Sequence, residues 1–287
     1  YPALHSDSVG MFGMFESVDD PSISALLLDK AHQWCMEKGF SRLMGPMNLS
    51  TNHECGLLIK GFDSPTMFGI PYNPDYYEKH FEAWGLQKAK DLLAMRLDLI
   101  KVPDYLERAA GKIKRRNRFN VRYLDLDRFE KEISVLWDIY NSAWSVNWGF
   151  VPMTQKEFEF SAREMKSIVQ PESCLIAEVE GEPAGFSLAL PDVNQVLREL
   201  DGRLFPFGWA KFLWKKNKID AYRVPTLGVK KKYRRLGIDA WFYYEIYRLF
   251  LEKKIKYLEL SWLLEDNKSI VEPMHRIGGE IYKRHRI

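Results

Sequence analysis

Residues 221–253 constrain the fold more than any other part of the chain. A strand is predicted over residues 221–229, a turn rich in lysine and arginine with Gly237 follows, and an apolar helix is predicted over residues 240–253. This order directs several backbone N–H groups and a helix N-terminus at one place, where they stabilise a phosphate. Glycine permits close approach of the backbone, and arginine and lysine add charge. We therefore predict an α/β fold with a phosphate-binding turn at residues 229–240.

Composition narrows the class of protein. The chain has 287 residues, of which 46% are hydrophobic and 28% are charged, as in soluble globular proteins of one large domain or two smaller ones. Its net charge of +3 is too small to indicate nucleic-acid binding. No apolar run is long enough to span a bilayer, and no signal peptide opens the sequence. Three scattered cysteines without metal-binding spacing favour free thiols in a reducing compartment, so a cytoplasmic location and no metal are expected.

Alternating strands and helices predict a mixed β-sheet with helices on both faces. In the first half, strands are expected at 8–16, 42–47 and 91–99, and helices at 23–38 and 73–84. In the second half, strands are expected at 121–126, 174–180, 184–190, 221–229, 257–262 and 280–287, and helices at 128–144, 154–168, 240–253 and 267–277. A polar helix with a basic end separates the halves. We therefore predict a domain at residues 1–102, a connecting helix at 103–118 and a second domain at 119–287.

The two halves repeat one order of elements. Strand, helix, strand, helix and strand follow one another over residues 9–99, as they do over residues 221–287. The first copy has the acidic segment 16–20 where the second has its basic turn, and acidic groups repel a pyrophosphate. It also lacks the opening strands of the second copy, so we expect the given sequence to be trimmed at its N-terminus. The first half is therefore expected to be a partial, degenerate copy that does not bind the phosphate ligand.

The basic turn resembles motif A of the GNAT superfamily of acyl-CoA-dependent N-acyltransferases. Arg234 and Gly237 match the first two fixed positions of that motif, and Asp239 stands where the family has glycine or alanine. The segments after residue 257 resemble the family's fifth strand and motif B, so the resemblance implies two GNAT-like domains. It also implies acetyl-CoA or another acyl-CoA as cofactor, bound by Leu227, Gly228, Val229, Arg234, Arg235, Leu236, Gly237, Ile238, Asp239, Ala240 and Asn267.

The same resemblance implies that an amine attacks the thioester carbonyl directly, with both substrates positioned where two parallel strands separate. A backbone N–H near residues 227–229 stabilises the charge that develops on the carbonyl oxygen. A base must take a proton, because an ammonium cannot attack. Glu259 is the first candidate and Glu265 the second. The alternative for Glu259 is a carboxylate that faces solvent from a strand. The alternative for Glu265 is a charge at the start of a helix.

Polar segments in both halves are candidates for an acceptor pocket. The candidate side chains are Asn48, Asn52, Glu54, Tyr72, Asn73, Asn147 and Trp148. In the first half, the alternative is that these groups cap helices and satisfy loop backbone. Around Trp148 the alternative is aromatic core. The expected acceptor is the amine of a small molecule or a peptide.

The insertion at residues 204–218 carries an aromatic face flanked by lysines. Such a segment fits a peripheral membrane contact or a cover over a long acyl chain. A lid packed on the sheet and a homodimer contact are the alternatives.

Taken together, these features predict an N-acyltransferase, in the first place an N-acetyltransferase. One alternative is an acyl-CoA-binding sensor or scaffold without catalysis, which Asp239 favours. The other is a Fem-type aminoacyl transferase, whose tandem halves have this layout.

Overall fold

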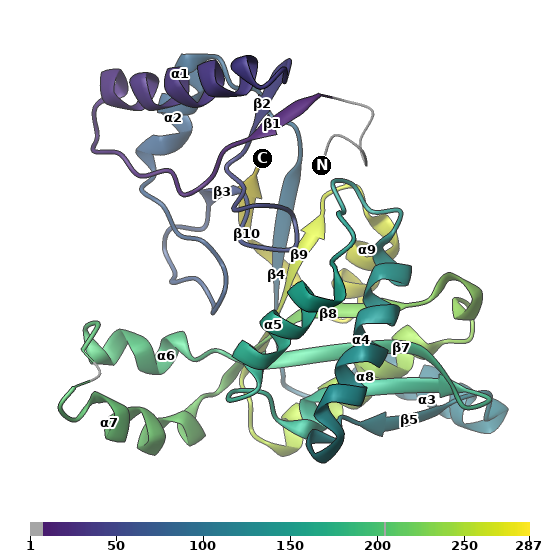
Figure 1. Cartoon of the computed structure of the whole chain (residues 1–287). Helices are drawn as coiled ribbons and strands as arrows, with labels where there is room; N and C mark the ends of the chain where they lie inside the picture. Colours follow the sequence, from purple (N-terminus) through teal and green to yellow (C-terminus); the bar gives the residue numbers. More distant parts are fainter. Residues whose placement is uncertain (1–7, 204) are drawn as a thin grey trace.

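The computed structural model of the chain describes residues 8–203 and 205–287 (Figure 1). Its strands are β1 (Val9–Met11), β2 (Arg42–Met44), β3 (Leu57–Lys60), β4 (Asp91–Asp98), β5 (Asn120–Tyr123), β6 (Cys174–Val179), β7 (Glu182–Pro191), β8 (Ala221–Val229), β9 (Tyr257–Leu264) and β10 (Glu280–Arg286). Its α-helices are α1 (Pro21–Glu37), α2 (Tyr76–Trp84), α3 (Asp104–Arg116), α4 (Phe129–Trp144), α5 (Gln155–Met165), α6 (Asn194–Leu197), α7 (Gly208–Lys215), α8 (Ile238–Glu252) and α9 (Lys268–Arg276). The predicted α/β class is confirmed.

One mixed sheet of eight strands, in the order β3-β10-β4-β9-β8-β7-β6-β5, organises the molecule. The β8–β9 pair in this sheet is parallel, and the other pairs are antiparallel. A parallel pair needs a crossover connection, which α8 supplies between β8 and β9. The sequence segment that most constrains the fold therefore lies at the middle of the sheet.

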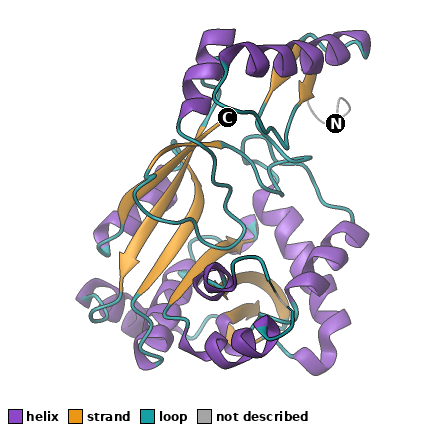
Figure 2. Ribbon diagram, turned by 90° about the vertical axis from the view of Figure 1, so that its left-hand side faces the viewer, coloured by secondary structure: helices purple, strands orange, loops and turns teal. Residues whose placement is uncertain are grey.

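Helices cover both faces of this sheet (Figure 2). On one face, Phe242 of α8 and Met274 of α9 belong to a buried core that also includes residues of α3. On the other face, Ile139 of α4 packs in a separate core. Because neighbouring residues of a strand point to opposite faces, β6 contributes Leu175 to the first core and Ile176 to the second.

The first half contains a second, smaller parallel pair. β1 and β2 are parallel with α1 between them, as β8 and β9 are with α8. The remaining strands of the first half join the large sheet, because β3 pairs with β10 and β4 lies between β9 and β10. Met95 and Leu97 of β4 belong to the same core as α8. The large sheet therefore crosses the domain boundary predicted at residues 103–118.

Three details of the first half differ from expectation. The strand predicted at 8–16 ends at Met11, and the chain turns at Met14, whose φ is 52°. The strand predicted at 42–47 ends at Met44, just before a glycine and a proline. β3 was not predicted, because its four residues show no period-two alternation and stand before a stretch rich in glycine and proline.

One buried carboxylate holds β4 to β10. Asp91 is fully buried and accepts hydrogen bonds from Arg284 at 2.8 Å and from Arg286 at 2.9 Å. Lys88 adds an ion pair at 3.1 Å. Burial by itself raises the pKa of Asp91, but these three cations outweigh it and lower the pKa to about 2. The Asp91 carboxylate therefore stays ionised and stabilises the junction between the two halves.

Asp91→Asn is expected to lower the free energy of unfolding by about 3 kcal/mol, because it leaves two arginines without their buried anion. The folded-state pKa lies below the usual 3.8. The contribution of the carboxylate is therefore complete above about pH 4 and declines as the pH falls toward about 2. Urea unfolding of wild type and variant at about pH 7 and about pH 3 measures this difference.

Asp98→Asn is the matched control on the same strand, since Asp98 is exposed and pairs with an exposed Arg96. Its effect should stay below about 1 kcal/mol. If the cost of Asp91→Asn is no larger than that of Asp98→Asn, or does not shrink on acidification, the assigned role of Asp91 is wrong.

Candidate functional site

The parallel ladder between β8 and β9 stops half-way along the two strands. Paired positions run from Ala221–Tyr257 to Val224–Leu260, although both strands continue beyond them. The next residue of β8 is Pro225, which has no N–H to donate. At the same level, β8 bulges against β7. The two strands therefore separate after Val224 and leave one edge of β8 unpaired.

That free edge offers backbone N–H groups. Lys230 donates its N–H to Ala184 of β7 at 2.8 Å. Successive residues of a strand direct their N–H groups to opposite edges. The N–H groups of Leu227 and Val229 therefore point toward the gap between β8 and β9. Both residues belong to the segment that the sequence predicts to contact an acyl-CoA.

The turn after β8 leads into an open helix N-terminus. Arg235 and Gly237 have positive φ values of 75° and 88°, so the chain reverses tightly before α8 begins. Within the described residues, no side chain caps the first turn of α8, so its N–H groups have no intrahelical or side-chain acceptor. A β-carbon at Gly237 would lie 3.0 Å from Ile113 of α3. The backbone conformation therefore favours glycine here, and Ile113 of α3 packs close against it.

The charge around this turn is mainly positive. Lys231 and Arg235 are exposed, and neither has a carboxylate partner in the part of the chain that is described. The basic last turn of α3, residues 114–116, follows the contact with Gly237. Asp239 is the opposing charge, and its side chain is exposed on the first turn of α8. A helix N-terminus, free cations and unpaired strand N–H groups together fit the diphosphate and the amide arm of a coenzyme A ester.

Two contacts hold α4 against β8 beside this turn. Arg234 donates hydrogen bonds to the carbonyl oxygens of Ala143, at 2.9 Å, and Val229, at 3.2 Å. A β-carbon at Gly228 would lie 2.2 Å from the ring of Trp144, so only glycine allows this approach. The Arg234 side chain therefore fixes the end of α4.

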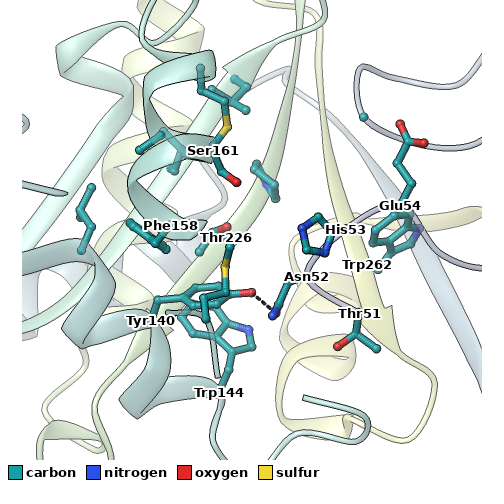
Figure 3. A pocket seen from close by; sticks show the side chains of 18 of the residues that line it. Thr51, Asn52, His53, Glu54, Tyr140, Trp144, Phe158, Ser161, Thr226 and Trp262 are labelled. Atoms are coloured by element: carbon teal, nitrogen blue, oxygen red, sulfur yellow. Dashed lines mark hydrogen bonds between the residues drawn. The ribbon is translucent and has the colours of Figure 1, made fainter. Parts of the chain in front are cut away.

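A cavity of about 610 Å³ lies on the α4 and α5 face of the sheet, beside the gap between β8 and β9 (Figure 3). Its inner part, the deep arm, is apolar and is lined by Leu124, Phe129, Ile133, Leu136, Ala162, Met165, Val169 and Cys174. Most of these side chains are buried. Pro225 and Thr226 of β8 also line the cavity, so it reaches the point where the two strands separate.

The other end of the cavity, its mouth, is polar and comes largely from the first half of the chain. It is lined by Asn48, Thr51, Asn52, His53, Glu54, Asn147, Trp148 and Trp262. Asn52 accepts a hydrogen bond from Tyr140 of α4 and donates one to the carbonyl oxygen of Val151, both at 2.7 Å. Thr51 donates to the carbonyl oxygen of Gly149 at 2.8 Å. The loop 48–55 is thus fixed to the second half.

Three residues of the mouth, Thr51, His53 and Trp262, were not predicted from the sequence, and of these His53 can accept a proton. Its Nδ1 lies 3.1 Å from the hydroxyl oxygen of the buried Ser50. When Nδ1 is protonated and donates to Ser50, Nε2 remains as a proton acceptor. Figure 3 shows the ring between Thr226 and Trp262, and all three residues line the cavity. The only sequence signal was a histidine beside a carboxylate in a polar loop.

The two carboxylates selected from the sequence do not line the cavity. Glu259 is fully buried and accepts hydrogen bonds from Ser261, at 2.6 Å, and from Tyr282. Ser261 in turn accepts one from Arg223, which does line the cavity. Glu265 accepts hydrogen bonds from Lys88 and from the backbone N–H of Asp91. Glu259 thus positions Arg223, and Glu265 holds β4.

The remaining predicted residues divide between the cavity and the scaffold. Asn48, Asn52, Glu54, Asn147 and Trp148 line the mouth together. Tyr72 and Asn73 do not, and Asn73 instead bonds both backbone groups of Leu58 in β3. Asn267 is the N-cap residue of α9 and accepts from Ser269 at 2.6 Å.

Known proteins are similar in sequence to this chain over almost its whole length. No family model matches the chain. Over 292 aligned positions the chain is 38% identical to protein YghO of Escherichia coli, covering 99% of this chain and 74% of that protein. Over 286 positions it is 36% identical to the bacterial ceramide synthase of Caulobacter vibrioides, covering 97% and 74% respectively.

Two solved structures share the fold at low sequence identity. A GCN5-related N-acetyltransferase from Sphaerobacter thermophilus superposes with a TM-score of 0.56 at 12% identity, over 93% of this chain and 67% of that one. The glucosamine N-acetyltransferase region of a fungal multi-domain beta-N-acetylglucosaminidase superposes with a TM-score of 0.53 at 12% identity. This match covers 91% of this chain and 27% of that longer one.

The chain therefore has a fold of the GNAT class, with the two central strands separated. Within that class, the chain belongs to the family of YghO and the bacterial ceramide synthase.

Proposed function

We propose that this chain transfers a long acyl group from acyl-CoA to the amino group of a long-chain amino alcohol, which forms an amide of the ceramide type. The deep arm carries the proposal, because it is apolar and belongs to a cavity that reaches the point where β8 and β9 separate. An acetyl group, the first expectation from the sequence, fills little of about 610 Å³. The relationship to a bacterial ceramide synthase supports the proposal, since a ceramide is an N-acylated long-chain amino alcohol.

The bound acyl-CoA supplies an acyl group activated as a thioester. We assign its diphosphate to the N-terminus of α8, with Lys231 and Arg235 beside it. The amide arm lies along the free edge of β8, where Leu227 and Val229 offer N–H groups. The acyl chain enters the deep arm, and the amino alcohol approaches from the mouth.

In the reaction, the amine nitrogen forms a bond to the carbonyl carbon, the carbon–sulfur bond breaks, and the thiolate of coenzyme A leaves. The N–H of Leu227 or Val229 stabilises the negative charge on the carbonyl oxygen. The proton that the amine loses goes to Nε2 of His53, whose Nδ1 is held by Ser50. We assign the base to His53, since Glu259 does not line the cavity.

His53→Gln is expected to lower kcat by about 100-fold to 1000-fold and to change KM little, because glutamine keeps the polar contact to Ser50 but does not accept the proton. Steady-state kinetics with a long-chain amino alcohol measures both constants.

Glu259→Gln distinguishes His53 as the base from Glu259, which the sequence analysis selected first. It should destabilise the chain, because Glu259 accepts two buried hydrogen bonds, while the folded fraction keeps most of its activity. A stably folded, inactive Glu259→Gln together with an active His53→Gln would show that Glu259 is the base.

The length of the acyl group tests the proposed reaction itself. Mass spectrometry of products from an amino alcohol and a series of acyl-CoA esters should show kcat/KM rising with chain length, by about fourfold for each methylene until the deep arm is full. That factor corresponds to about 0.8 kcal/mol for each buried methylene. Binding of these esters without any product, over a panel of amines, would instead indicate a sensor.

Ala162→Phe, which narrows the deep arm, should shift the preference to shorter acyl groups and leave the preference for the amine unchanged. Ala31→Phe is the matched control, a half-buried helical alanine in a different core, and it should leave both preferences unchanged. A change in the preferred length of the amine would mean that the amine, and not the acyl group, occupies the deep arm.

A further inference from the structure

The described residues 193–203 and 205–219, between β7 and β8, form a hairpin that contains α6 and α7 and extends away from the sheet (Figure 1). Its base packs on the body of the protein, where Val196 shares a small core with Phe68. Asn194 donates a hydrogen bond to the carbonyl oxygen of Thr66 at 3.1 Å. Phe68 also lines the cavity. The base of the hairpin is therefore fixed beside the substrate cavity, while its far end extends into solvent.

The far end exposes large apolar side chains. Phe205 is 81% exposed, Phe207 is 77% exposed and Trp214 is 66% exposed, and Trp209 and Leu213 are each about half exposed. These side chains lie within ten consecutive residues. Soluble proteins scatter such residues singly, and a contiguous group of them marks a contact with another molecule or with a membrane.

Positive charge is concentrated on the same hairpin. It carries six lysines and arginines against two acidic residues, a net charge of +4, which exceeds the net charge of +3 of the whole chain. The rest of the chain is therefore slightly acidic. Lys218 lies 4.2 Å from the ring of Trp214, and Lys216 is the residue next to the end of α7. At Trp214, therefore, a cation lies against an exposed aromatic ring, while Lys211 and Lys215 pair with Glu199 of the same hairpin.

We propose that this hairpin docks the protein on an anionic lipid bilayer. Tryptophan and phenylalanine side chains enter the interface between headgroups and acyl chains, and the lysines contact anionic headgroups. None of the helices described for the chain has the length and apolarity that a membrane crossing requires. The proposed contact is made by side chains of the hairpin at the bilayer surface.

A second copy of the chain is the other occupant to weigh, and charge disfavours it. A symmetric dimer through the hairpin places two surfaces of +4 against each other, whereas an anionic bilayer neutralises both the lysines and the arginines. Docking depends on the hairpin alone and does not rest on the proposed reaction. If that reaction holds, docking places the cavity beside the bilayer from which a lipid amine is drawn.

Vesicle flotation tests the proposal with the full chain. The wild type should bind vesicles of equal parts phosphatidylcholine and phosphatidylglycerol, and bind phosphatidylcholine alone much less. Trp209→Ala/Trp214→Ala should lower binding at least about tenfold. Lys216→Gln/Lys218→Gln should lower binding to the anionic vesicles by about fivefold for each lysine and leave binding to neutral vesicles unchanged.

The matched controls lie on α1. Trp34 is 55% exposed and has Lys38 5.7 Å from its ring, so Trp34→Ala and Lys30→Gln/Lys38→Gln remove the same groups from another surface. These variants should bind as the wild type does. Circular dichroism and thermal melting check that every variant is folded, as expected for exposed positions.

Three outcomes overturn the proposal. The first is a wild type that does not bind the anionic vesicles. The second is equal loss of binding in the α1 controls and in the hairpin variants. The third is a wild-type dimer, seen by light scattering, that Trp209→Ala/Trp214→Ala converts to a monomer without any vesicle binding, since this result assigns the hairpin to a second copy.

Discussion

The structure depends on the interruption of one β-ladder. β8 and β9 are paired only as far as Val224 and Leu260, because Pro225 has no N–H and β8 bulges there against β7. The interruption exposes the N–H edge of β8, and the crossover helix α8 presents its open N-terminus at the end of that edge. Gly228 lets Trp144 of α4 pack directly on β8. The free strand edge thus follows from one local departure from regular pairing, and the cavity reaches β8 at that same point.

The cavity divides its lining between the two halves of the chain. Helices α4 and α5 and the strands beneath them form the apolar deep arm, while the loop 48–55 of the first half supplies most of the polar mouth. An apolar cavity with a group of polar side chains at one end is typical of a ligand site. Hydrogen bonds from Thr51 and Asn52 fix the loop, and the Asp91 cluster fixes β4 in the sheet. The first half, which lacks a basic glycine turn, therefore still supplies most of the polar mouth of the cavity.

Sequence reasoning was most effective where one segment determines its own structure. The strand, turn and helix around Gly237 follow from local chemistry, and the structure confirms them. The insertion of β4 between β9 and β10 was not predictable, because strand order depends on contacts between residues far apart in sequence. The same holds for His53, whose place at the cavity depends on how the first half packs on α4. Glu259 was selected for its strand position, and its burial could not be read from alternation alone.

We propose that the separated strands lead into a cavity for the acyl chain. A structure of the chain with a long-chain acyl-CoA bound tests this directly. We expect the diphosphate at the N-terminus of α8, the amide arm along β8 between Thr226 and Val229, and the acyl chain in the deep arm beside Ala162 and Cys174. An acyl chain lying outside the deep arm, or a diphosphate bound away from Gly237, would contradict it.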